Sequence, residues 1–331
     1  MSKNPSEADL LARMAWLYYK EDMTQHEIAK RLNLSRSKVV RLLQKAKDEG
    51  IVHFHIISPL GNCLCLEQEL KSIFELENAM VVPVGQYEKI RETLGKAAAQ
   101  YLEICLKSGH LFAVGWGRTV YEVARFIRSN NIKNLKIVTL NGGLTTSFYL
   151  NPYDVGAKLS SLFKGECYYI HAPAIAASEE LCRSFRSDLT VKQALQMAKL
   201  ANYSLVGIGE MSAETTLVST GYISLADVEI LHRKGAVGNI VGQFFDIKGN
   251  IIDCDLHKRI VAFPIEELRG MKNVIGVAGG KDKIEAILGA LHGNFMKVLI
   301  TDEETATSMI SLEKNRVEYK TKGETKDGNR S

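Results

Sequence analysis

The chain has 331 residues, a length that suits two or three domains better than a single hydrophobic core. Hydrophobic residues make up 46% of it, as in ordinary folded proteins, and the net charge of +4 is too small to mark the whole molecule as a binder of polyanions. No apolar run approaches the roughly 20 residues that span a bilayer, so we expect no membrane contact. Any affinity for nucleic acid must come from local clustering of charge.

The cysteines and the N-terminal residues indicate a cytoplasmic protein. The six cysteines include no C-x-x-C pair, and the opening residues MSKNPSEADL lack an apolar signal core. Free thiols in a reducing compartment explain this pattern better than a zinc site or a disulfide. We therefore expect no metal and no cofactor.

Residues 1–58 are predicted to form a helix-turn-helix domain. Apolar residues at spacings of three and four predict a first helix over 6–20. Thr24 is placed to cap a second helix over 25–32, with a glutamate three residues later that completes a capping box. Ser35 is placed to cap a third helix that runs from 36 to about 49.

The turn between the second and third helices has its own signals. Asn33 stands where the turn needs a left-handed residue, and Ala29 is small where the two helices cross. The predicted core of this domain consists of Ile28, Leu32, Leu34, Val39, Leu42 and Leu43. A wing strand is expected at 51–56, where apolar residues alternate with others.

Charge supports the same interpretation. Seven basic residues and no acidic residue lie between Lys30 and Lys47. A recognition helix enters the major groove by its N-terminal end, so the residues there should lie near base edges and phosphates. The residues expected to contact operator DNA are Gln25, Ser35, Arg36, Ser37, Lys38 and Arg41. The alternative is a solvated basic helix in an ordinary helical subdomain.

Residues 59–312 are predicted to form an α/β effector and oligomerisation domain. Residues 58–62 have the composition of a linker, and 66–74 form an amphipathic helix that is a candidate for contacts between subunits. Short apolar strands are expected near 79–84, 111–115, 136–140, 167–171, 204–208, 273–277 and 297–301. Their alternation with helices predicts a Rossmann-like parallel sheet that is covered on both faces. The polar tail, residues 313–331, is expected to be disordered.

Four glycine-bearing segments, residues 114–119, 140–144, 235–246 and 276–283, are interpreted as loops after strands, where ligands of open α/β sheets bind. Glycines let a backbone approach an anion, a helix N-terminus adds partial positive charge, and side-chain amides and carboxylates bind hydroxyls. The candidate effector residues are Gly115, Gly117, Arg118, Thr119, Asn141, Gly142, Gly143, Asp246 and Lys283. Tight strand-to-helix turns, a strand-end turn aspartate and a solvated lysine are the alternatives. The convergence of the four segments favours a small polyhydroxylated anion as the effector.

At these residues the chain resembles the SorC family of sugar-sensing transcriptional regulators, and within it the LsrR type. The segments that carry the resemblance from about Leu10 to Leu312 are LYYKEDMTQHEIAKRLNLSRSKVVRLLQKAKDEGIV, GWGRT, LNGG, YSLVGIG, GYIS, KGAVGNIVGQFFD, GVAGGKDKIEAIL and VLITDEETA. The resemblance implies an effector domain with the fold of the ribose-5-phosphate and glucosamine-6-phosphate isomerases. It also implies a tetrameric repressor or activator whose operator binding responds to the effector.

The resemblance also divides the candidate effector residues into two groups. It implies a phosphate-side role for Gly115, Gly117, Arg118, Thr119 and Lys283. It implies a sugar-side role for Asn141, Gly142, Gly143 and Asp246. The GWGRT segment departs from the LsrR loop in its second half, so a pentose, hexose or polyol phosphate stays open as the effector.

The function that fits best is a DNA-binding regulator of a carbohydrate-utilisation operon, controlled by a small phosphorylated sugar or polyol. It is expected to be a homo-oligomer and not an enzyme. One alternative is a sugar-phosphate isomerase with an accessory DNA-binding domain, in which Asp246 would be the general base and His171 or His257 its partner. Another is an interaction module whose sugar pocket is a relic.

Overall fold

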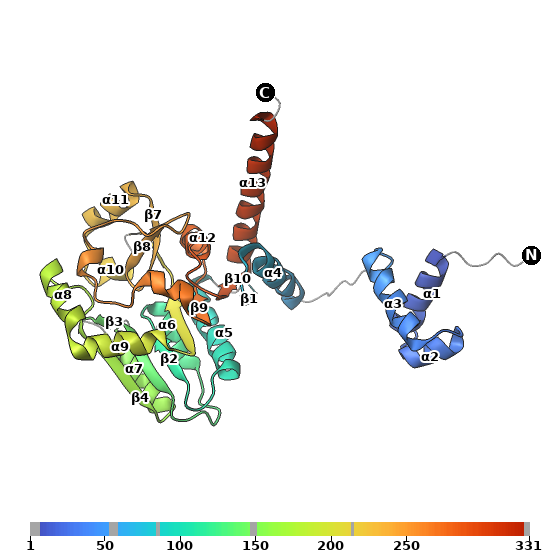
Figure 1. The fold of residues 1–331 in the computed structure, drawn as a ribbon, viewed down its shortest axis with the longest axis horizontal. Helices are drawn as coiled ribbons and strands as arrows, with labels where there is room; N and C mark the ends of the chain where they lie inside the picture. The colour runs from blue at the N-terminus through green and yellow to red at the C-terminus, as the bar shows by residue number, and fades with distance from the viewer. Residues whose placement is uncertain (1–6, 53–58, 84–86, 146–150, 213–214, 328–331) are drawn as a thin grey trace, which may run out of the picture. The chain divides into compact units, whose positions relative to one another are not determined.

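The computed structural model describes residues 7–52, 59–83, 87–145, 151–212 and 215–327 (Figure 1). The chain divides into two compact units, Met1–Ser58 and Pro59–Ser331. Among the described residues, no helix combines the length and the apolar character needed to cross a bilayer.

The N-terminal unit contains three helices, α1 (Glu7–Tyr19), α2 (Gln25–Arg31) and α3 (Arg36–Asp48). The predicted caps are present, because Thr24 forms a capping box with the glutamate at position 27 and Ser35 accepts a hydrogen bond from the backbone N–H of Lys38. Asn33 has a φ of 53°, the left-handed conformation expected of the turn. The three predicted helices are therefore confirmed.

The core of this unit joins all three helices. Its buried residues include Leu11 and Met14 of α1, Ile28 of α2 and Leu42 of α3. Ile28 and Leu42 were predicted to belong to this core, whereas Leu11 and Met14 were not. The expected wing at 51–56 falls mostly outside the described residues.

The second unit is built on a parallel sheet of seven strands, and all seven predicted strands belong to it. In chain order they are β1 (Asn78–Val82), β2 (Leu111–Val114), β3 (Lys136–Gly143), β4 (Glu166–Pro173), β5 (Tyr203–Gly207), β9 (Val274–Val277) and β10 (Val298–Asp302). The order across the sheet is β1-β10-β9-β5-β2-β3-β4, and every neighbouring pair is parallel. Strands such as β9 and β10 are buried along their whole length, which requires cover on both faces.

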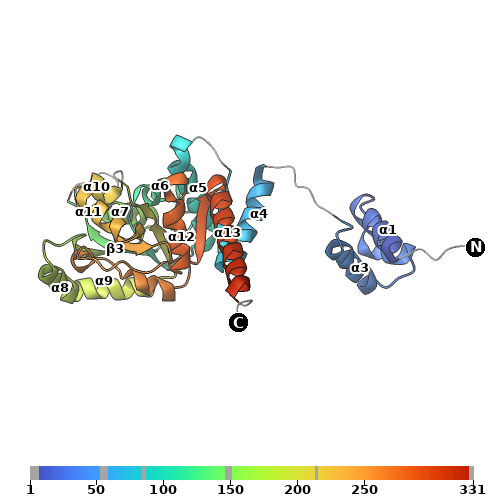
Figure 2. The ribbon, with the colours of Figure 1, turned by 90° about the horizontal axis from the view of Figure 1, so that it is seen from above.

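Helices provide that cover (Figure 2). One face packs against α5 (Ile90–Cys105), α6 (Arg118–Phe126) and α7 (Pro152–Leu162). The other face packs against α4 (Pro59–Phe74), α9 (Leu189–Lys199), α12 (Ile284–His292) and α13 (Glu303–Asp327). The remaining helices are α8 (Glu179–Ser187), α10 (Thr216–Ser219) and α11 (Leu225–Arg233).

A second, antiparallel sheet was not predicted. It consists of β6 (Gly209–Glu210), β7 (Ala236–Ile240) and β8 (Gln243–Asp246). Residues 235–246 were predicted to be a glycine-bearing ligand loop, and this prediction was wrong because they form the hairpin of β7 and β8. Val241 and Gly242 have φ values of 49° and 82°, so they form a two-residue hairpin turn between β7 and β8.

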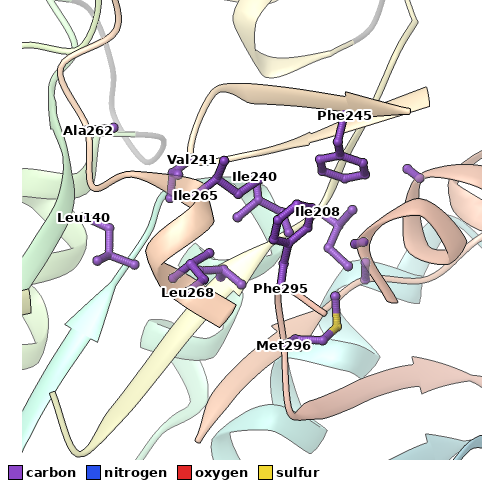
Figure 3. Close-up of a cluster of buried hydrophobic side chains, with 14 of the residues drawn as sticks. Leu140, Ile208, Ile240, Val241, Phe245, Ala262, Ile265, Leu268, Phe295 and Met296 are labelled. Carbon is purple, nitrogen blue, oxygen red and sulfur yellow. The ribbon is translucent and has the colours of Figure 1, made fainter. Parts of the chain in front are cut away.

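The hairpin is anchored by apolar side chains. Figure 3 shows Ile240, Val241 and Phe245 of the hairpin in one cluster with Leu268 and Phe295. All five side chains are buried. The hairpin is therefore part of the main core and holds the short strand β6 in a fixed place beside β7.

Two expectations at the ends of this unit need correction. Residues 58–62 were interpreted as a linker, but α4 begins at Pro59, because proline is favourable in the first turn of a helix. The tail from residue 313 was expected to be disordered, but α13 continues to Asp327. Glu313 contacts His292 of α12 at 3.0 Å and Lys314 pairs with Glu69 of α4, so polar contacts fix the start of this segment.

A candidate nucleic-acid interface and a candidate effector cavity

The N-terminal end of α3 carries unpaired positive charge. Arg36, Lys38 and Arg41 are exposed, and within the described part of the chain none of them has an ion-pair partner. By contrast, Arg31 pairs with an acidic residue at 3.1 Å and Lys45 with another at 2.6 Å. Arg36, Lys38 and Arg41, on the expected recognition surface, therefore remain available for phosphates.

The other predicted DNA contacts lie on the same end. The hydroxyl oxygen of Ser35 accepts the hydrogen bond that caps α3. The same oxygen lies 3.1 Å from the hydroxyl of the exposed Ser37. Gln25 is half-buried and lines one hollow together with Arg36. Val40, which was not among the predicted contacts, is 45% exposed on α3 three residues after Ser37. An exposed aliphatic residue in a basic helix suits contact with a thymine methyl group.

In the second unit, a cavity lies where the strand order reverses. The chain runs from β2 to β3 and β4 and then returns to β5, which pairs with the opposite edge of β2. The segments after β2 and β5 diverge there and leave a cavity of about 590 Å³, including its open mouth. Its lining consists of Arg91, Trp116, Gly117, Arg118, Thr119, Gly207, Ile208, Gly209, Glu210, Thr215, Leu217, Asn239 and Lys283.

The start of α6 forms one wall of the cavity. Gly117 precedes the helix with a φ of 119°, a conformation that favours glycine, and no side chain caps this end. Arg118 and the buried Thr119 occupy the first turn, and Arg91 of α5 lies beside them. Neither arginine has an ion-pair partner among the described residues. An uncapped helix N-terminus with two unpaired guanidinium groups is suited to a phosphate.

The facing wall combines Lys283 with short strand β6. Lys283 ends the single turn η4 (Lys281–Lys283), donates a hydrogen bond to the backbone oxygen of Ile208 at 2.6 Å and pairs with Glu210 at 3.0 Å. Burial alone would raise the pKa of Glu210, but the charge of Lys283 and hydrogen bonds to the carboxylate hold that pKa below its usual value. Glu210 is therefore ionised at neutral pH.

Polar groups that the sequence analysis missed complete this wall. Asn239 of β7 lies opposite Gly209 of β6 and is 5% exposed, and its Nδ2 is buried without a hydrogen-bond partner. Thr215 is 3% exposed. The antiparallel pairing of β6 with β7, which has no local sequence signal, brings Asn239 to the cavity.

Gly115, which follows β2, and the candidate residues at the end of β3 contact other parts of the fold and not the cavity. Gly115 donates its N–H to Leu205 at 2.9 Å. Asn141 is buried and donates from Nδ2 to the backbone oxygen of Val241 at 2.9 Å. A Cβ atom on Gly142 would lie 2.5 Å from a backbone oxygen of β4, and one on Gly143 would lie 2.6 Å from the ring of residue 153. The structure places all four outside the cavity lining.

Asp246 also lies away from the cavity. Its carboxylate accepts hydrogen bonds from the N–H of Lys248 at 2.9 Å and from the N–H and side-chain amide of Asn250 at 2.8 and 2.9 Å. This is the strand-end turn that was the alternative interpretation. His171 is exposed on β4, and His257 accepts a hydrogen bond from the backbone N–H of residue 244. The groups considered for isomerase chemistry are therefore not brought together in the cavity.

The two units match two different protein families. The sugar-binding domain family matches residues 58–311, and sigma-70 region 4 matches residues 16–48. The transcriptional regulator LsrR of Enterobacter sp. (strain 638) is 34% identical over 315 residues, which cover 93% of this chain and 94% of that protein. The chain belongs to the SorC family. The deoxyribonucleoside regulator of Bacillus subtilis (strain 168) is 33% identical over 301 residues, or 90% and 96% of the two chains.

The SorC-family fold extends over both units. The crystal structure of the full-length sorbitol operon regulator SorC from Klebsiella pneumoniae superimposes with a TM-score of 0.71 at 26% identity, and covers 92% of this chain and 100% of that one. This member of the SorC family is thus a DNA-binding transcriptional regulator that carries a sugar-binding domain.

Proposed function

We propose that this SorC-family regulator controls a carbohydrate-utilisation operon and that its effector is a phosphorylated sugar or polyol. Three cations line the cavity, Arg91, Arg118 and Lys283, together with one carboxylate, Glu210. The resulting formal charge of about +2 complements a phosphomonoester, which carries about −1.5 to −2 at pH 7. The two unpaired arginines at the uncapped start of α6 are the observation on which this proposal rests.

The regulator acts in the cytoplasm as a homo-oligomer, for which we propose a tetramer. A single small helix-turn-helix unit reads few base pairs, so operator recognition requires at least two such units on paired half-sites. Effector binding then changes operator affinity by favouring one arrangement of the subunits over another.

The proposed function does not include catalysis. An isomerase needs a general base near its substrate carbon, and Glu210 is the single carboxylate among the residues that line the cavity. Its ion pair with Lys283 weakens it as a base. Aldose–ketose interconversion measured with ribose 5-phosphate and glucose 6-phosphate tests this directly, and turnover that Glu210→Gln abolishes would establish the enzyme instead.

Thermal unfolding of the full-length protein tests the phosphate site. Inorganic phosphate and a panel of sugar monophosphates are added, and a ligand at 100 times its Kd should stabilise the fold by about 2.7 kcal/mol, or a few degrees. Arg118→Gln and Thr119→Val should weaken binding about tenfold or more, because each removes a phosphate partner. Arg128→Gln is the control, since that exposed arginine lies just beyond the far end of α6. No shift with any compound would refute the proposal.

A further inference from the structure

Glu210 is the feature of the cavity that a simple anion site does not explain. It stands in the two-residue strand β6, which pairs with β7 and cannot shift without breaking that pairing. Its carboxylate is 3.0 Å from Nζ of Lys283, and the two side chains are only 17% and 19% exposed. A carboxylate held this firmly beside a phosphate site should influence which anions can bind.

The ion pair makes the two walls of the cavity electrostatically different. On the α6 wall, Arg91 and Arg118 form no ion pair with any described residue, although the charge of Arg91 also acts on Glu210 at longer range. On the β6 wall, Glu210 neutralises Lys283, and Lys283 also donates a hydrogen bond to the backbone oxygen of Ile208. One end of a bound ligand therefore lies near net positive charge. The other end lies near the ionised carboxylate of Glu210, whose counter-ion Lys283 already forms an ion pair and a hydrogen bond.

The hydrogen-bonding groups differ in the same way. A carboxylate only accepts hydrogen bonds, so Glu210 can bind a hydroxyl of a sugar but not a second phosphate or a carboxylate. The buried amide of Asn239 lies in the neighbouring strand, and its Nδ2 has no partner of its own. Together these two side chains suit a hydroxyl that donates to one of them and accepts from the other.

We propose that Glu210 is a specificity-determining residue that limits the effector to a single anionic group, so that phosphomonoesters of neutral sugars or polyols bind while sugar bisphosphates and phosphorylated sugar acids are rejected. This inference rests on the proposed function, because it assumes that the single phosphate lies at the start of α6. Rejection by an unfavourable charge is a common source of specificity in binding sites.

Two matched pairs of probes test the proposal on the full-length protein by calorimetry. Fructose 6-phosphate is compared with fructose 1,6-bisphosphate, and the open-chain sorbitol 6-phosphate with 6-phosphogluconate, so that each pair differs by one anionic group. The wild-type protein should prefer the less charged member of each pair by about tenfold or more, as expected for like charges a few ångströms apart in a partly buried site. Glu210→Gln should reduce that preference about tenfold, whereas Glu285→Gln, at an exposed position on α12, should leave it unchanged.

The outcomes separate the inference from the proposed function. The inference is overturned if neither monophosphate binds more tightly than its more charged partner, whether both bind equally or neither binds. It is also overturned if Glu210→Gln keeps the wild-type preference. The wild-type comparison alone decides the matter should Glu210→Gln fail to fold. The proposed function survives these results if inorganic phosphate still stabilises the wild-type protein and Arg118→Gln removes that effect, and it falls with the inference if inorganic phosphate has no effect.

Discussion

His257 should make the stability of the second unit depend on pH in a defined window. It stands in the single turn η2 (His257–Arg259), where Nε2 accepts the backbone N–H of Phe244 at 2.7 Å. Its ring also stacks on the ring of Phe244, with centroids 5.5 Å apart and planes 1° from parallel. Burial lowers the pKa of His257 from its ordinary 6.5 to about 4, and the nearby Asp253 opposes that shift. The neutral imidazole is therefore the native form.

The size and sign of the effect follow from this pKa. The unfolded chain takes up the proton near pH 6.5 and the folded chain only near pH 4, so stability is fully present above pH 6.5 and is lost as the pH falls toward 4. The complete loss for His257 is about 3 kcal/mol, and about 2 kcal/mol of it should be gone at pH 5. Most carboxylates have not yet titrated at pH 5, so the contribution of the histidine can be separated there.

Urea unfolding between pH 7.5 and 5 measures this loss, with His257→Gln as the informative variant. Glutamine places an oxygen near the position of Nε2 and can still accept the Phe244 N–H, but it does not titrate. The variant should lose about 2 kcal/mol less than the wild type over this range, whereas His171→Asn, at an exposed position, should behave as the wild type. Equal losses in wild type and His257→Gln would refute the reasoning.

Three further predictions concern residues with a proposed function or a structural role. Arg36→Ala should reduce the slope of log DNA affinity against log salt concentration by about 1 for each DNA phosphate that the protein no longer neutralises. Lys133→Ala, on the second unit, should leave the slope unchanged. Equal slopes in the wild type and Arg36→Ala would argue against α3 as the recognition helix. Gly142→Ala should cost about 1–3 kcal/mol of unfolding free energy because its Cβ would lie 2.5 Å from a backbone oxygen, whereas Gly270→Ala meets no atom within 4 Å and should be nearly neutral in chemical denaturation. Asp246→Asn should lower stability by about 1 kcal/mol and leave effector affinity unchanged in calorimetry, and a loss of affinity would return Asp246 to the site.

Most of the fold could be predicted because its signals are local. The capping residues Thr24 and Ser35 and the turn residue Asn33 act within a few positions of the chain. The seven parallel strands are short apolar runs between helices, and each was found near its observed position. The hairpin of β7 and β8 was missed because its glycines resemble those of a ligand loop. The positive φ values of Val241 and Gly242 and the pairing of β7 with β8 show that the segment is a tight turn instead.

Four of the predicted effector residues line the cavity, Lys283 on one wall and three residues at the start of α6 on the other, and each belongs to a glycine-bearing segment with a local sequence signal. Gly117, Arg118 and Thr119 form one strand-to-helix turn, and the structure places all three in the cavity. Glu210 and Asn239 come from strands that pair antiparallel across 29 positions of the chain, and no short-range pattern indicates that pairing. Glu210 and Asn239 are thus long-range partners, which sequence periodicity does not reveal.

The central claim is that a phosphorylated effector in the cavity at the start of α6 controls DNA binding by the N-terminal helix-turn-helix unit. The most direct test is the affinity of the full-length protein for DNA from upstream of its own operon, measured with increasing concentrations of a sugar monophosphate that stabilises it. We predict that the effector changes this affinity about tenfold or more, and that Arg118→Gln binds the same DNA equally well but no longer responds. DNA affinity that stays constant at saturating effector, or a full response in Arg118→Gln, would contradict the account.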